Sequence, residues 1–365
     1  MSSSYGEKIK VTIFGESHGP SLGLVIDGLP PGVALNLEEV AREMRRRAPG
    51  QNAFSTPRQE TDAFHIQSGW FEGKTTGTPL CALVYNEDTR SQDYTRSKDV
   101  LRPSHADYTG RVKYQGFNDY RGGGSFSGRL TAPLVFVGAI AKQILALRGI
   151  TLGAHIVKIG QVTERRFNPL GESPTTLRTL TTQTLPVLEK QRGREMAEVI
   201  VAAGADHNSV GGSVECMAVG LPVGLGEPFF DSVESKLAHA LFAIPAVKGV
   251  EFGLGFGLTG LTGSEANDQM CFVQGQVQTL TNQNGGILGG ITNGMPLVLQ
   301  VGFKPTPSIA QPQQTVNVAT GTNEIITIAG RHDPCIVPRA VPVVEGVTAW
   351  VLLDLLLLAE NKLVV

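Results

Sequence analysis

The chain has few cysteines, few aromatic residues and little charge. Its 365 residues include four cysteines, 6% aromatic and 18% charged residues, and its formal net charge is -2. The cysteines stand far apart, without a CxxC pair or a metal-ligand spacing, which disfavours a disulfide framework and a metal site. A nearly neutral chain has no bulk attraction for nucleic acid, so an anionic ligand would need a local basic site.

The sequence also lacks targeting and membrane signals. The N-terminal MSSSYGEKIK has no apolar core of the kind found in signal peptides, which favours a cytoplasmic location. Near the C-terminus, the apolar run AWVLLDLLLLA has eleven residues and includes Asp354. Such a run is too short to span a membrane, so it predicts a buried helix and no membrane partner.

Glycine, in contrast, is abundant, with 44 of the 365 residues, and it is neither periodic nor gathered into a linker. This distribution is typical of many tight turns. Residues 9–14 and 22–28 predict a hairpin, and helices are predicted after Asn36, over 129–149, after the cap Asp231, and over 345–361. Since helices interrupt paired strands, we predict an α+β fold with antiparallel sheets, and a single domain over 1–365.

The seven histidines fall into different contexts. His18, His105 and His332 lie in polar, turn-forming runs beside other reactive side chains, and His155 and His239 lie in a predicted strand and helix. Histidine exchanges a proton near neutral pH, so the first three are candidates for general acid or base roles. We interpret the last two as structural.

The stretch YRGGGSFSGRLTA, residues 120–132, leads three glycines into a predicted helix. Free backbone N–H groups and the positive end of a helix suit an anion, although a simple glycine turn before a core helix would look the same. Because the chain has neither a Walker A lysine pattern nor a GxGxxG after a strand, nucleotide binding in those two styles is disfavoured.

Arg47 continues the apolar stripe of the first predicted helix, so its charge is predicted to turn inward, where it needs an anionic partner. The alternative is a frayed helix end, and the neighbouring arginines Arg42, Arg45 and Arg46 are interpreted as solvated. Two further polar loops, KPTPSIAQPQ at 304–313 and GRHDPC at 330–335, follow predicted strands. Together these residues suit a phosphorylated or polycarboxylate substrate better than a hydrolytic triad or a metal site.

Eight motifs, in order along nearly the whole chain, resemble those of the chorismate synthase family. They are GESHG (15–19), RPSHADYTG (102–110), RGGGSFSGRLTA (121–132), GLGEPFFD (224–231), AVKGVEFG (246–253), GGILGGITNG (285–294), KPTPSI (304–309) and GRHDPC (330–335). The resemblance implies a β-α-β sandwich with antiparallel sheets inside and helices outside, in a homotetramer. It also implies a lyase that makes chorismate from 5-enolpyruvylshikimate 3-phosphate by anti-1,4-elimination of phosphate, the last step of the shikimate pathway. The reaction would need reduced FMN without net redox change, with NADPH as one source of the electrons.

The same resemblance implies the site residues. Ser17 and His18 would lie near the leaving phosphate, His105 would lie by the flavin ring, and Asp333 would assist removal of the proton on carbon 6. The substrate's anionic groups would bind Arg47, Arg102, Arg129 and Arg331, and Arg47 would also contact NADP. FMN would contact Ser125, Phe126, Ser127, Pro245, Ala246, Gly289, Lys304, Pro305, Thr306, Pro307, Ser308 and Arg331.

Three positions depart from the usual pattern of that family. Ser125-Phe126 replaces a basic and a small polar residue, Ala53 replaces a basic residue, and Pro245 replaces a frequent asparagine. Two other functions remain open: a flavin-dependent oxidoreductase acting on a phosphorylated metabolite, and a non-catalytic phosphometabolite-binding protein. Electron balance separates the two enzymes, since the lyase turns over many substrates per reduced flavin and the oxidoreductase one.

Overall fold

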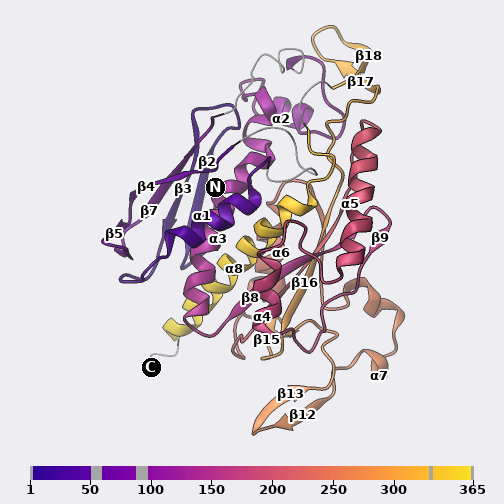
Figure 1. Ribbon diagram of the computed structural model, residues 1–365. Helices are drawn as coiled ribbons and strands as arrows, with labels where there is room; N and C mark the ends of the chain where they lie inside the picture. Colours follow the sequence, from indigo (N-terminus) through magenta and orange to yellow (C-terminus); the bar gives the residue numbers. More distant parts are fainter. Residues whose placement is uncertain (1–2, 51–59, 88–97, 329–331, 363–365) are drawn as a thin grey trace.

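The computed structural model describes residues 3–50, 60–87, 98–328 and 332–362. Two five-stranded antiparallel sheets lie on either side of a layer of helices (Figure 1). The first sheet has the strand order β1-β2-β3-β7-β4, and the second has the order β11-β16-β10-β8-β9. Their strands are β1 (Ser4–Tyr5), β2 (Lys10–Gly15), β3 (Ser21–Asp27), β4 (Phe64–Ser68), β7 (Leu80–Tyr85), β8 (Thr151–Ile159), β9 (Val162–Thr163), β10 (Gly212–Val219), β11 (Val247–Phe252) and β16 (Leu297–Phe303).

The central layer contains α1 (Leu37–Arg47), α3 (Thr131–Ala146), α6 (Val233–Phe242) and α8 (Val337–Lys362). The helices α4 (Pro174–Leu180) and α5 (Lys190–Ala205) pack on the other face of the second sheet, and α2 (Asp107–Lys113) lies near the cavity described below. The smaller elements are β5 (Trp70–Phe71), β6 (Lys74–Thr75), η3 (Arg121–Phe126), η4 (Gly128–Leu130), η5 (Phe229–Asp231), η6 (Gly255–Gly260), α7 (Gly263–Ala266), β12 (Met270–Val273), β13 (Gln276–Thr279), β14 (Ile287–Leu288), β15 (Ile291–Thr292), β17 (Gln313–Asn317) and β18 (Thr322–Ile326).

The α+β class and the β-α-β sandwich with antiparallel sheets are confirmed, but the inner layer consists of helices and the sheets lie outside it. The helices α3 and α8 are buried on nearly all sides, and one contiguous core joins them to both sheets. A helix that is apolar all round has no face to offer to water, so it lies in the middle of the molecule. The helices α4 and α5 lie outside the second sheet, as expected.

Two helical stretches, Gly128–Ala146 and Val337–Glu360, are long and apolar enough to cross a membrane by length and composition. Within the protein they are 78% and 94% buried, respectively. Burial of that extent is typical of core helices, which pass the same composition test. The eleven-residue apolar run predicted as a buried helix is therefore part of a longer one, since α8 has 26 residues and includes Pro342.

Several local predictions are confirmed. The hairpin forms between β2 and β3, with Lys10 opposite Asp27. Asn36 caps α1, because its side chain accepts hydrogen bonds from the backbone N–H groups of Glu38 and Glu39 at 3.0 and 3.2 Å.

Two local predictions need correction. The cap of α6 is Ser232, one residue after Asp231, and its hydroxyl accepts from the backbone N–H of Ser235. The short helix α2 was not predicted, since its seven residues show no long apolar stripe that could have revealed it.

Candidate active site

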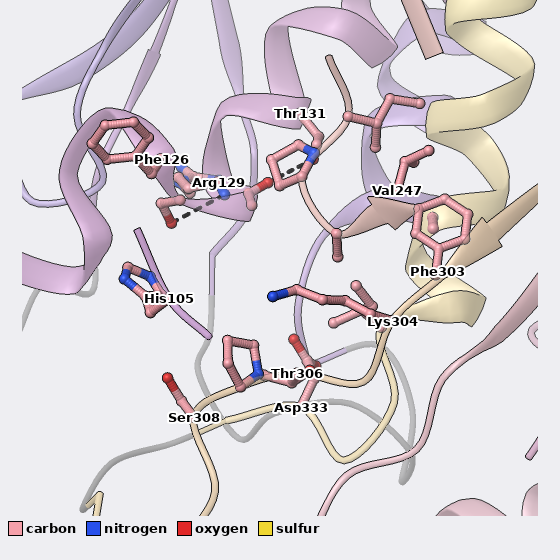
Figure 2. A pocket seen from close by; sticks show the side chains of 18 of the residues that line it. His105, Phe126, Arg129, Thr131, Val247, Phe303, Lys304, Thr306, Ser308 and Asp333 are labelled. Carbon is pink, nitrogen blue, oxygen red and sulfur yellow. Dashed lines mark hydrogen bonds between the residues drawn. The ribbon is translucent and has the colours of Figure 1, made fainter. Parts of the chain in front are cut away.

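A cavity of about 600 Å³ lies where the end of α1, the loop before α2, η3, the turn from α6 to β11, the end of β16 and the start of α8 meet. Its volume falls within the range of about 300–1,000 Å³ that is usual for small-molecule sites. Figure 2 shows His105, Lys304 and Asp333 around this space, with Phe126 and Phe303 at its sides. Segments more than 200 residues apart in the sequence therefore supply one site.

Positive charge dominates the wall of this cavity. Among its described lining residues, one is a carboxylate, Asp333, and six are cationic: Arg47, Arg102, Arg129, Lys248, Lys304 and Arg339. Such an excess attracts polyanionic ligands. Among the described residues, no group of three or more His, Cys, Asp or Glu is arranged to hold a metal ion.

Most of the predicted site residues meet at this cavity. The sequence-predicted residues in its wall are Arg47, Arg102, His105, Ser125, Phe126, Ser127, Arg129, Pro245, Ala246, Lys304, Thr306, Pro307, Ser308, His332 and Asp333. Arg331 and Ala53 lie outside the described residues. Gly289 and Pro305 are not in the wall, and Gly289 instead occupies the turn between β14 and β15. That hairpin is held against the start of α6, since the carbonyl of Gly290 accepts from the backbone N–H of Val233 at 2.9 Å.

The three glycines of η3 bring the first two predicted histidines together. Gly122, Gly123 and Gly124 have φ values of 58°, 96° and 53°, a region that favours glycine. A Cβ on Gly122 would lie 2.1 Å from the ring of His18, and one on Gly123 would lie 3.2 Å from Nε2 of His105. The glycine turn therefore packs against both rings, and side chains would push them away.

Ser17 and His18 lie behind this turn and not in the cavity wall itself. Ser17 is fully buried, and its Oγ donates to the carbonyl of Arg121 at 3.3 Å and lies 3.0 Å from Nδ1 of His18. When the single hydroxyl proton of Ser17 points to this carbonyl, Nδ1 of His18 is the donor to Ser17. In that tautomer Nε2 is the other ring nitrogen of His18.

Asp107 orients His105. Nδ1 of His105 lies 2.6 Å from Oδ1 of Asp107, and Arg102 donates to the same carboxylate through Nε and Nη2 at 2.8 and 2.7 Å. Burial raises the pKa of Asp107, but the hydrogen bonds from Arg102 and His105 outweigh it and hold that pKa well below its usual range. The ionised carboxylate keeps the proton on Nδ1, so Nε2 is the atom that His105 offers for chemistry.

Arg47 is buried as predicted, and its partner is Asp62. Nε of Arg47 donates to Oδ2 of Asp62 at 2.8 Å, and Arg129 donates to Oδ1 of the same carboxylate. Arg129 also reaches Oε2 of Glu60 at 3.3 Å. Burial lowers the pKa of Arg47 to about 10, because the attraction of Asp62 does not offset burial together with the repulsion of Arg339 and Arg129. An added anion would relieve this imbalance.

Lys304 lies at the opposite wall, held by two residues with unusual backbone conformations. Its Nζ donates to the carbonyl of Ser104 at 2.6 Å, and its backbone N–H donates to the carbonyl of Ala246 at 3.0 Å. Ser104 and Ala246 have φ values of 58° and 72°, which is uncommon for residues with a side chain. Burial and the nearby Lys248 lower the pKa of Lys304, which again leaves room for an anion.

The cavity fits a flavin nucleotide. Phe126, Phe242 and Phe303 supply aromatic surface, and Lys248 and Lys304 supply positive charge for a phosphate. Thr306 Oγ1 is a buried polar atom with no hydrogen-bond partner among the described residues. A buried hydroxyl without a partner is costly, so a ligand atom at this position would stabilise it.

Sequence reasoning missed three kinds of residue here. Asp62 gave no signal, because one carboxylate in a polar loop is unremarkable until folding places it between two arginines. Lys248 lies within the motif 246–253 and Arg339 lies four residues after GRHDPC, but nothing in the spacing shows that they face the cavity. Asp107 lies within the motif 102–110, and only the structure shows its hydrogen bond to His105.

Comparisons with known proteins show the family to which the chain belongs. The sequence profile of the family described as chorismate synthase matches residues 9–357. The chain is 47% identical over 359 residues to the chorismate synthase of Dehalococcoides mccartyi strain BAV1, covering 98% of both chains. It is 48% identical over 353 residues to that of Pyrococcus abyssi, covering 96% of this chain and 97% of the relative.

A solved structure extends the similarity to the fold. The protein described as "Crystal Structure of Chorismate Synthase" superposes with a TM-score of 0.76 at 29% sequence identity, covering 97% of this chain and 93% of that chain. Profile, sequence relatives and fold thus agree over nearly the full length, and the chain belongs to the chorismate synthase family as an enzyme of that type.

Proposed function

We propose that the protein is a single-domain lyase that converts 5-enolpyruvylshikimate 3-phosphate to chorismate and phosphate, with reduced FMN bound in the same cavity. The observation that carries this proposal is the excess of cationic side chains in the wall, beside His105 and Asp333. The substrate has a phosphate and two carboxylates, and FMN adds another phosphate. A site for both must therefore compensate several negative charges at once.

The flavin would be held by segment 125–127, by Pro245 and Ala246, by Lys304 and by the loop to Ser308, which all line the cavity except Pro305. When bound, reduced FMN would supply electron density that helps the phosphate leave. The carbon–oxygen bond to phosphate breaks, the proton on carbon 6 is lost, and a new double bond forms, so the reaction has no net redox change.

The chain's own residues have separable parts in this reaction. Arg47, Arg102 and Arg129 bind and orient the anionic groups of the substrate, where paired N–H donors fix both charge and direction. His18, protonated on both ring nitrogens, gives the proton on Nε2 to the departing phosphate and keeps the one on Nδ1. His105 presents Nε2 to the flavin, since Asp107 holds its other nitrogen. Asp333 assists removal of the proton from carbon 6.

An anaerobic assay tests the proposal. Purified protein, chemically reduced FMN and the substrate are mixed, and chorismate and phosphate are measured together. We expect equal amounts of both products and many turnovers per reduced flavin. One turnover per flavin would indicate the oxidoreductase instead, and absence of chorismate would refute the lyase. Replacing reduced FMN with oxidised FMN and NADPH shows whether the protein reduces its own flavin.

Single-site variants test the role of His18. We expect His18→Ala to slow turnover by about 10²-fold or more, the scale typical of general acid catalysis. His239→Gln is the matched control, because His239 lies on α6 and stacks on Tyr5 at 4.4 Å. A near-wild-type rate for His18→Ala would remove His18 from the mechanism.

We also propose that the active form is a cytoplasmic homotetramer. Exposed apolar side chains on the β12–β13 hairpin, Met270 at 65% and Phe272 at 80% exposure, provide surface that association would cover. Light scattering coupled to gel filtration measures the mass. A monomer at micromolar concentration would contradict this part of the proposal.

A further inference from the structure

We infer that Arg339 is a positioning residue that fixes the carboxylate of Asp333 against the end of α1. This inference rests on the proposed function, in which Asp333 assists removal of a proton from the substrate. Arg339 belongs to the first turn of α8, and its guanidinium faces the cavity between Asp333 and the last residue of α1.

Two hydrogen bonds define the arrangement. Nη1 of Arg339 donates to Oδ2 of Asp333 at 2.5 Å, and Nε of Arg339 donates to the backbone carbonyl of Arg47 at 2.9 Å. Both partners are well shielded from water, since the side chains of Arg339 and Asp333 are 20% and 12% exposed. One rigid, planar group thus joins the loop that carries Asp333 to the helix that carries Arg47.

The chemistry of both partners favours a guanidinium. The last carbonyls of a helix have no partner within the helix and carry partial negative charge, so a cation stabilises them. A carboxylate beside a guanidinium is held in direction as well as in charge, because the donors of arginine have fixed geometry. Lysine has a single flexible ammonium and cannot hold both acceptors with the same geometry.

Stability alone does not account for this placement. Arg339 repels Arg47 and contributes to the lowered pKa of Arg47, so the pair of arginines opposes folding. Proteins retain such unfavourable pairs at functional sites when the arrangement serves the reaction. Here the benefit is geometric: Asp333 and the substrate-binding Arg47 keep a constant separation, because the same side chain contacts both.

The consequence is a specific kinetic signature. If Arg339 acts through Asp333, its loss reduces the chemical step while substrate binding is largely kept. We expect Arg339→Gln and Arg339→Lys to lower kcat by about 10- to 100-fold, the scale of a small misplacement of a catalytic group, with KM changed less than about threefold. Guanidinium ion added to Arg339→Ala should restore part of kcat.

A double-variant cycle gives the decisive test. We expect Arg339→Gln combined with Asp333→Asn to be no slower than Asp333→Asn alone, because the two residues act as one unit. The matched control is Arg148→Gln, which breaks an arginine pair with Glu360 of the same helix α8, away from the cavity. That control should leave kcat and KM unchanged. Additive losses in the double variant would overturn the inference.

Two measurements separate this inference from the proposed function. If the wild type makes no chorismate, the proposed function fails. Urea unfolding of the wild type, Arg339→Gln, Asp333→Asn and the double variant still measures the coupling between Arg339 and Asp333. Zero coupling there would overturn the pairing itself. Binding of oxidised FMN, followed by quenching of its fluorescence, should change less than about threefold in Arg339→Gln. Loss of FMN binding would show a structural role for Arg339 and refute positioning.

Discussion

Arg46 and Arg47 are neighbours on α1, yet they belong to two different kinds of charge cluster. Arg46 donates to Glu43 at 2.7 Å and to both oxygens of Glu345 at 2.6 and 3.0 Å. Lys142 completes this group by donating to the same two carboxylates. The Arg46 cluster, made of Arg46, Glu43, Lys142 and Glu345, therefore has two positive and two negative charges and lies outside the cavity wall.

The Arg47 cluster, made of Arg47, Arg129, Asp62 and Glu60, also has two positive and two negative charges, but it lies against the cavity, where Arg339 and other cations add positive charge. The two arginines respond differently to burial. Burial lowers the pKa of Arg46, but Glu345 and Glu43 outweigh it and raise that pKa above its usual value. For Arg47 the balance is reversed, and its pKa falls to about 10. A balanced cluster away from other charges serves stability, and a balanced cluster with further cations beside it can bind an anion.

The largest effect is expected from opening the Arg46 cluster. Glu345→Gln leaves Arg46 and Lys142 buried with one carboxylate, and removal of one partner from a buried ion pair typically costs about 3–5 kcal/mol of unfolding free energy. Urea unfolding measures it. Glu360→Gln on the same helix is the control, since its side chain is 45% exposed and should change stability by less than about 0.5 kcal/mol. An equally small change in Glu345→Gln would contradict the role of this cluster.

A variant of Arg47 should change activity more than stability. Arg47→Met should lower kcat/KM by about 10²-fold or more, since a buried charge contact to the substrate is lost. Its unfolding free energy should change by less than about 1.5 kcal/mol, because Asp62 keeps Arg129 as a partner and the repulsion between arginines is relieved. Steady-state kinetics and urea unfolding measure the two quantities. The neighbouring, exposed Arg45 provides the control variant Arg45→Met. A large loss of unfolding free energy with unchanged kinetics would show that Arg47 stabilises the fold and does not bind the substrate.

A smaller effect is expected from Asp107, which acts on the reaction through His105. Asp107→Asn keeps the shape but loses the charge that holds the proton on Nδ1, so we expect kcat to fall about tenfold. For His105→Ala, kcat should fall further, by about 10²-fold. Asp99→Asn, at an exposed pair with Arg111, is the control. If Asp107→Asn matched the wild type, the orientation of His105 would not depend on this carboxylate.

The sequence predicted the local elements better than their arrangement. The cap at Asn36, the β2–β3 hairpin and the inward turn of Arg47 follow from short-range patterns that each segment carries by itself. The layer order depends on how the whole chain packs, and two helices that are apolar on every side look the same in sequence wherever they lie. The family resemblance named the motifs at the site, and most of them meet at one cavity.

The partners of buried charged side chains were the hardest feature to predict from the sequence. Arg46 was interpreted as solvated, because a run of arginines usually faces water, but its side chain is 10% exposed. Its partner Glu345 lies 299 positions along the chain, and no pattern near Arg46 points to it. Asp62 and Arg339 were missed for the same reason. Long-range ion pairs are set by the fold, so single-sequence reasoning finds the charge but not its partner.

A third cluster tests the distinction with the smallest expected effect. His155 is fully buried between Glu164 and Glu215, with Nε2 3.0 Å from Glu215, and Arg166 donates to Glu215 at 2.6 Å. This group is balanced only while His155 is protonated. Burial lowers the pKa of His155, but the hydrogen bonds to the two carboxylates outweigh it and raise that pKa above its usual value of 6.5.

The sign of the pH dependence follows from that shift. A folded pKa above the unfolded one gives stability that is fully present below pH 6.5 and lost as pH rises through the folded value. We expect the unfolding free energy to decline from pH 6.5 upward, and His155→Gln to flatten that decline. Urea unfolding of both proteins at several pH values measures it. Because His155 and its partners are absent from the cavity wall, kcat of the folded variant should follow that of the wild type at each pH. If His155→Gln lost activity but kept the pH-dependent stability of the wild type, His155 would act in the reaction and not in stabilising the fold.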